Sequence, residues 1–152
     1  MRMRRLAWGA AIALVLSGCR AEPTAHGPEE RLAVAVEQAG QAGKPLKLAD
    51  ATDFPWDRVH IFSPYVATAD IERALGFRWP EAAATGIQER DDVALLVFVQ
   101  GKRVVRTLRP ARNRGDWAMI ENHAGFTPAK AVFHVTRDEG DPPWWNVTEP
   151  RP

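Results

Sequence analysis

The chain has little cysteine, no marked excess of charge and no apolar run long enough to span a bilayer. Its one cysteine, Cys19, has no partner for an internal disulfide, so the folded part must be held together by an apolar core. Without cysteine pairs a metal site would depend on histidine, and His26, His60, His123 and His134 have no recognisable ligand spacing. We therefore expect neither a bound metal nor any other cofactor.

Charge is nearly balanced, with 20 basic against 19 acidic side chains. Three of the basic residues lie within the first 18 residues, which hold no acidic one, so the rest of the chain has 17 basic and 19 acidic side chains. A near-neutral body argues against nucleic acid as a partner.

Common enzyme motifs are missing as well. Ser17 and Ser63 do not lie in a Gly-x-Ser-x-Gly turn, and the scattered glycines form neither a phosphate loop nor a dinucleotide fingerprint. Hydrolases of that type and nucleotide-dependent enzymes are therefore disfavoured.

An acid–base pair would be another route to catalysis. Asp57 and His60 are three residues apart, so on a strand their side chains would point to opposite faces. A pair would require the fold to bring His60 or His123 to Asp57 or Glu121. A small periplasmic hydrolase that uses such a pair is the alternative to the function favoured below.

The N-terminus has the pattern of an export signal. Arg2, Arg4 and Arg5 precede an apolar run of 11 residues, Leu6 to Leu16. A transmembrane helix needs about 20 apolar residues, so this run is too short to span a bilayer. We expect it to be removed during export.

The run ends in Leu16-Ser17-Gly18-Cys19, which resembles the lipobox of bacterial lipoproteins. The resemblance implies cleavage before Cys19 and lipid attachment to its sulfur, so that the protein meets the membrane through an N-terminal lipid. Arg20 stands where an aspartate would imply retention at the inner membrane. The expected location is the bacterial cell envelope, at the outer membrane and facing the periplasm.

Composition divides the chain into four parts. Residues 1–18 are the expected signal peptide, and residues 19–28 a flexible, lipid-anchored linker. Residues 29–140 have the size of a single domain. Residues 141–152 contain four prolines and two tryptophans and are expected to be an irregular tail.

Apolar spacing and turn residues predict the elements of the domain. Thr68 is expected to cap the second helix and Gly76 to end it. Residues 93–99 are almost wholly apolar, which predicts a central strand covered on both faces. The expected helices cover residues 29–40 and 68–75, and the expected strands cover 44–49, 56–62, 93–99, 103–109, 117–120 and 131–137.

Tight turns between most of these strands predict an α+β fold. We expect a mostly antiparallel sheet of four to six strands, with two helices packed on one face.

The run WDRVHIFSPY, residues 56–65, is followed by a short helix, Trp79, an apolar strand and a Gly-Lys hairpin. This WDxVxxFxPY strand-turn pattern resembles a family of small, uncharacterised bacterial envelope lipoproteins. The resemblance covers roughly residues 53–109 and implies a fold and a compartment, without an activity or site residues.

Large aromatic side chains and arginines are the candidate binding residues, because both are enriched at recognition surfaces. Arginines crowd the second hairpin strand and the loop after it, where they could contact anionic headgroups: Arg103, Arg106, Arg109, Arg112 and Arg114. The candidate binding residues are Trp56, Asp57, His60, Tyr65, Trp79, Arg106 and Arg109. The favoured function is a noncatalytic binding module whose partner is an envelope protein, peptidoglycan or a glycolipid.

Overall fold

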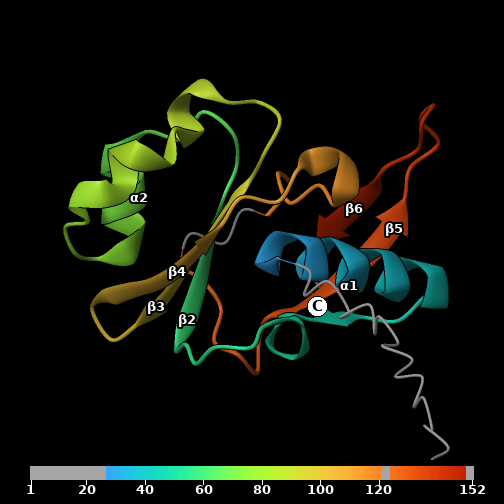
Figure 1. Ribbon diagram of the computed structural model, residues 1–152, viewed down its shortest axis with the longest axis horizontal. Coiled ribbons are helices and arrows are strands. Elements are labelled where there is room, and N and C mark those ends of the chain that lie inside the picture. The colour runs from blue at the N-terminus through green and yellow to red at the C-terminus, as the bar shows by residue number, and fades with distance from the viewer. Residues whose placement is uncertain (1–26, 121–123, 150–152) are drawn as a thin grey trace, which may run out of the picture.

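The computed structural model describes residues 27–120 and 124–149 (Figure 1). The expected signal peptide, Cys19 and most of the linker lie outside these residues, as do Glu121 and His123 of the alternative catalytic pair. In the part of the chain that is described, no helix is both long and apolar enough to cross a bilayer.

The predicted α+β class is confirmed. The described residues contain two α-helices, six strands and four short 3-10 turns. In chain order these are α1 (Pro28–Ala42), β1 (Leu46–Lys47), η1 (Leu48–Ala51), β2 (Arg58–Phe62), α2 (Thr68–Leu75), η2 (Pro80–Thr85), η3 (Ile87–Glu89), β3 (Leu95–Gln100), β4 (Arg103–Leu108), η4 (Arg112–Arg114), β5 (Val132–Arg137) and β6 (Trp145–Thr148).

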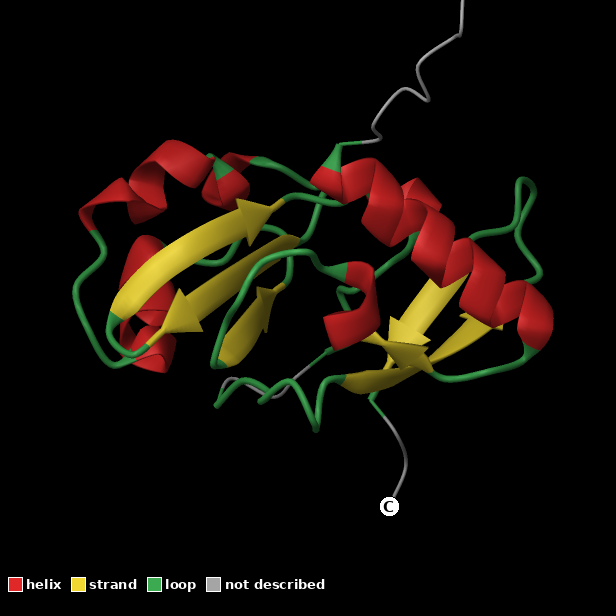
Figure 2. Cartoon of the chain, turned by 60° about the horizontal axis from the view of Figure 1, so that its bottom comes forward, coloured by secondary structure: helices red, strands yellow, loops and turns green. Residues whose placement is uncertain are grey.

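The strands form two three-stranded antiparallel sheets, where the sequence predicted one sheet. The first has the order β1-β5-β6 and the second the order β2-β3-β4. Each sheet has its own helix: α1 contacts β1, β5 and β6, whereas α2 contacts β2 (Figures 1 and 2). The two helices therefore do not share one face of a common sheet.

The larger apolar core joins the two sheets. It combines Leu32 and Val36 of α1 with Phe98 of β3 and Phe133 of β5. A smaller core on the other face of the second sheet packs α2 and the segment after it against β3. Because Phe98 and its neighbour Val97 belong to different cores, β3 is covered on both faces, as its apolar run predicted.

Local sequence signals explain both helices. Pro28 occupies the first turn of α1, where its missing N–H costs nothing, and Gly43 ends the helix with φ 61°. The predicted cap of α2 is wrong, because Thr68 lies inside the helix and Ala67 precedes it. The carboxylate of Glu72 accepts a hydrogen bond from the backbone N–H of Trp79 (2.8 Å) and so ties the following segment to α2.

Two further predictions differ from the structure. Residues 117–120 form a turn, and only Asp116 before them makes a strand-like bridge, to Asn146. The expected irregular tail contains β6, whose Val147 is fully buried. The prolines of this segment predicted no regular structure, but its backbone forms hydrogen bonds with β5 and with Asp116.

Candidate functional site

The candidate site lies along β4, the outer strand of the second sheet. Gly101, with φ 59°, opens the two-residue turn that joins β3 to β4, where the favoured hairpin turns need a positive φ. The carboxylate of Asp57 accepts a hydrogen bond from the Gly101 N–H (2.7 Å). The residue just before β2 thus holds the tip of the hairpin in place.

A β-bulge sets the direction of the two exposed arginines of β4. Gln100 pairs with Arg103 and Phe98 pairs with Arg106, and the register shifts by one residue between these pairs. Gln100 and Phe98 are two residues apart, so they and their partners lie on one face of the sheet. In a regular strand Arg103 and Arg106 would face opposite sides, so the bulge is what brings them together.

Arg106 is held in place by an aromatic ring. Its guanidinium carbon lies 5.2 Å from the ring centroid of Phe54, and that ring packs edge-on against Phe98 at 5.1 Å. A cation over an aromatic face gains about 0.5–1 kcal/mol at an exposed site while its N–H groups stay free to donate. The ring therefore positions Arg106 without neutralising it.

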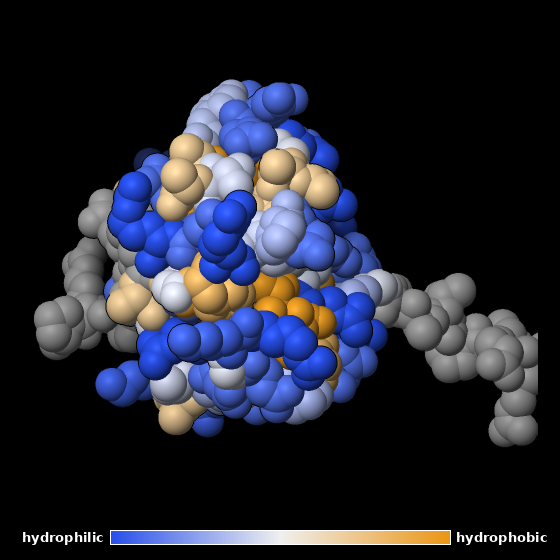
Figure 3. Space-filling model, turned by 90° about the vertical axis from the view of Figure 1, so that its left-hand side faces the viewer, coloured by the Kyte–Doolittle hydropathy of each residue, from blue (hydrophilic) through white to orange (hydrophobic). Residues whose placement is uncertain are grey.

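A groove of about 470 Å³ runs beside β4, between Lys102–Thr107 and Phe77–Glu81. We call it the basic groove, because its lining carries four cations and one acid: Arg78, Lys102, Arg103, Arg106 and Glu81. Among the described residues none of the four cations forms an ion pair. Figure 3 shows the side of the molecule on which α2 and the β3–β4 hairpin lie, with hydrophilic side chains around a small apolar strip.

The structure places the predicted aromatic residues mainly in the core. Trp56 is buried edge-on against Phe98, and its indole N–H donates to the hydroxyl of Thr52 (3.0 Å). Trp79 is buried in the smaller core, although its edge also lines the basic groove. The predicted aromatic residues therefore do not form one exposed patch.

Tyr65 is exposed. Its side chain is 62% accessible, and its backbone has φ 63°, a left-handed conformation that costs a non-glycine residue roughly 1–2 kcal/mol. Its backbone N–H donates to the carbonyl of Ile87 (3.0 Å). Tyr65 is not among the residues that line the basic groove.

His60 is buried, with 3% of its surface accessible, and its ring stacks with Phe62 at a centroid distance of 6.3 Å. His60 and Asp57 both line a small hollow of about 240 Å³ beside α2. The Asp57 carboxylate is already bonded to Gly101, and the other members of the alternative catalytic pair lie outside the described residues.

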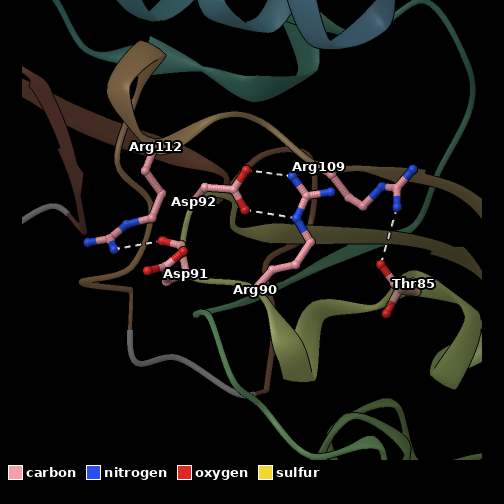
Figure 4. Close-up of polar contacts among 6 residues, drawn as sticks. All are labelled: Thr85, Arg90, Asp91, Asp92, Arg109 and Arg112. Atoms are coloured by element: carbon pink, nitrogen blue, oxygen red, sulfur yellow. Dashed lines mark hydrogen bonds and ion pairs between the residues drawn. The ribbon is translucent and has the colours of Figure 1, made fainter.

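Arg109 has a structural contact. Its guanidinium donates to the backbone carbonyl of Thr85 (3.2 Å), which ties the end of β4 to η2 (Figure 4). Beside it, Arg90 holds the carboxylate of Asp92 through two hydrogen bonds. The bonds from Arg90 lower the pKa of Asp92 from its usual value.

The last two arginines of the predicted cluster are paired with acids. Arg112 donates to both carboxylate oxygens of Asp116, at 3.0 and 2.8 Å, and to the backbone carbonyl of Asp91. The Asp116 hydrogen bonds raise the pKa of Arg112. Arg114 pairs with Glu30 of α1 at 2.9 Å. Both arginines therefore belong to the framework and not to a free basic surface.

Arg78 and Lys102 were missed as site residues by the sequence reasoning. Lys102 stood in the predicted turn, next to the arginines of the following strand, so its place in the hairpin was an available signal. Arg78 lies in the segment before η2 and meets β4 only through the tertiary fold, which no local pattern indicates.

Within residues 27–120 and 124–149, no group of three or more histidine, cysteine, aspartate or glutamate side chains could hold a metal ion.

Comparison with protein-family models, with curated proteins and with solved structures finds no match to this chain. The geometry of the groove is therefore the basis for a functional proposal.

Proposed function

We propose that this protein is a noncatalytic binding module of the bacterial cell envelope, anchored by lipid at Cys19, and that it takes an anionic partner in the basic groove. The observation that supports the proposal is the set of cations that line the basic groove and form no ion pair with any described residue: Arg78, Lys102, Arg103 and Arg106. Charge-assisted hydrogen bonds from arginine are among the strongest contacts to carboxylates and phosphates.

The fixed geometry of the groove favours binding. The bulge and the Phe54 ring hold Arg106, and the Asp57–Gly101 bond holds the hairpin tip, so Arg106 has less side-chain freedom to lose when a partner binds. The bond of Asp57 to Gly101 gives that carboxylate a framework role, which counts against its use as a catalytic base.

Removing two groove cations is expected to weaken anion binding at least about tenfold, or about 1.4 kcal/mol. The variant is Arg103→Ser/Arg106→Ser, and the probe is fluorescein-labelled poly-L-glutamate, followed by fluorescence anisotropy with the full chain in nonionic detergent. Affinity should also fall as salt rises, because exposed charges are screened.

Lys44→Ser/Lys130→Ser is the matched control, because it removes the same charge from two exposed lysines that lie outside the groove. The control should bind like the unchanged chain. Equal losses in the two double variants would mean that only net charge matters. Absence of binding by the unchanged chain, both to poly-L-glutamate and to vesicles that contain phosphatidylglycerol, would overturn the proposed function.

The anchor has its own test. Mass spectrometry of the processed chain should find Cys19 as the first residue, with the added mass of acyl chains. Cys19→Ser should move the protein from the membrane fraction to the soluble periplasmic fraction, because two or more acyl chains are needed for stable anchoring. A bare thiol, or another first residue, would refute the envelope anchor and leave the groove proposal standing.

A further inference from the structure

We infer that the anionic partner is an extended acidic peptide, which adds as a fourth strand to the free edge of β4 and pairs two acidic side chains with Arg103 and Arg106. This inference rests on the proposed function and specifies the chemical class of the partner. Its elements are an open strand edge, a groove beside that edge and two cations on one face of it.

The backbone of β4 has polar groups that point away from the sheet. The Val99 carbonyl accepts a hydrogen bond from Asp57 N–H on the β2 side (2.8 Å). Val104 lies opposite Val99, and because the Val99 groups point to β2 the two residues form a non-hydrogen-bonded pair. Residues of a non-hydrogen-bonded pair direct their N–H and C=O groups away from each other. The N–H and C=O of Val104 therefore point to the outer edge, where no described backbone group bonds to them.

The other sheet edges in the described part of the chain are covered or very short. Phe126 exchanges two backbone hydrogen bonds with Val59 and so closes the outer side of β2. Asp116 covers β6, because its N–H donates to the Trp145 carbonyl and its own carbonyl accepts from the Val147 N–H. β1 has only two residues. The six-residue strand β4, about 20 Å long at 3.4 Å per residue, is thus the long open edge.

Charge decides between an acidic peptide and a second copy of the chain. Two β4 strands paired edge to edge would bring arginines and Lys102 of both copies together, and like charges across a pair of strands are destabilising. Cations on an edge strand are a common protection against such pairing. An acidic strand would replace that repulsion with ion pairs at Arg103 and Arg106.

The register specifies the peptide. Because of the bulge, Arg103 and Arg106 lie opposite Gln100 and Phe98, which are two residues apart. An added regular strand should therefore carry acids at alternate positions. Phe98 and Gln100 flank Val99, so their backbone groups point to β4, and their partners Arg106 and Arg103 direct theirs toward β3. The acids opposite the two arginines therefore direct their own amides away from β4. The residues between the acids are the ones that bond to the edge.

The test uses a fluorescein-labelled hexapeptide with alternating glutamate and threonine and two derivatives of it. In one derivative the backbone nitrogens of the threonines are methylated, and in the other the backbone nitrogens of the glutamates are methylated. Charge is the same in all three peptides. With the full chain in nonionic detergent, methylation at threonine should weaken binding at least about tenfold, since the amides that bond to β4 are lost, while methylation at glutamate should change it less than about threefold. The Arg103→Ser/Arg106→Ser variant should bind the parent peptide at least about tenfold more weakly.

Each other result is decisive. Equal binding of all three peptides would overturn strand addition and leave the groove as a simple anion site. Binding of vesicles that contain phosphatidylglycerol in excess of phosphatidylcholine vesicles, lost in Arg103→Ser/Arg106→Ser and without binding of any peptide, would also overturn it and assign the groove to lipid headgroups. Failure to bind the peptides, poly-L-glutamate and the vesicles would overturn both the inference and the proposed function.

Discussion

Replacing Trp117 with alanine is expected to lower the free energy of unfolding by about 3–5 kcal/mol, the usual cost of removing a large aromatic side chain from a core. Trp117 has no accessible surface, and its ring packs edge-on against Phe133 at 5.3 Å. It lies in the core that joins the two sheets, so the loss should lower the stability of the whole fold. Denaturant unfolding followed by circular dichroism measures the effect.

Trp117→Phe separates packing from polarity. The indole N–H of Trp117 is buried and has no hydrogen-bond partner among the described residues, and such a group costs about 1–3 kcal/mol. Phenylalanine removes that N–H and keeps an aromatic ring, so it should cost clearly less than alanine. Met119→Ala is the control, because Met119 is 67% exposed and should change stability by no more than about 0.5 kcal/mol. A similar small effect for Trp117→Ala would contradict the assigned core.

Elements with strong local signals were predictable. The helix at α1 follows from Pro28, two acids and apolar residues at helical spacing before Gly43. The buried strand β3 follows from its apolar run, and the hairpin follows from Gly101 in the turn. In each case the physical cause lies within a few neighbouring residues.

The division into two sheets was not predictable in this way. It depends on β1 pairing with β5, where Leu46 lies opposite Phe133, although most of the domain separates them in sequence. β6 likewise gains its partners from β5 and Asp116. Neither pairing follows from residues near these strands, because the tertiary core decides which edges meet.

The candidate site was predictable in part. Arg106 was a candidate, and Arg103 belonged to the predicted arginine cluster. The bulge that puts both on one face has no signal in the sequence, since it depends on how β4 pairs with β3. The aromatic candidates were predicted less well. Trp56 and Trp79 were candidate binding residues because tryptophan is enriched at recognition surfaces, but both are buried.

Replacing Gly125 with alanine is expected to lower the free energy of unfolding by about 3 kcal/mol. Gly125 has φ 75°, which costs a residue with a Cβ about 1–2 kcal/mol. A Cβ there would lie 2.7 Å from the backbone oxygen of Val59 and 3.0 Å from Nδ1 of His60. The Val59 carbonyl would have to move, which weakens the hydrogen bond that it accepts from the Phe126 N–H, worth about 1 kcal/mol.

Gly86→Ala is the matched control for Gly125→Ala. Gly86 has a similar φ of 67°, but a Cβ there would meet nothing within 4 Å, so only the conformational cost of about 1–2 kcal/mol should remain. Hydrogen exchange at the amides of Val59 and Phe126 should accelerate in Gly125→Ala and stay unchanged in Gly86→Ala, because only the first substitution disturbs the cover on β2. Equal losses of stability would mean that the close contact with Val59 contributes nothing, and that the edge of β2 is held closed by other contacts.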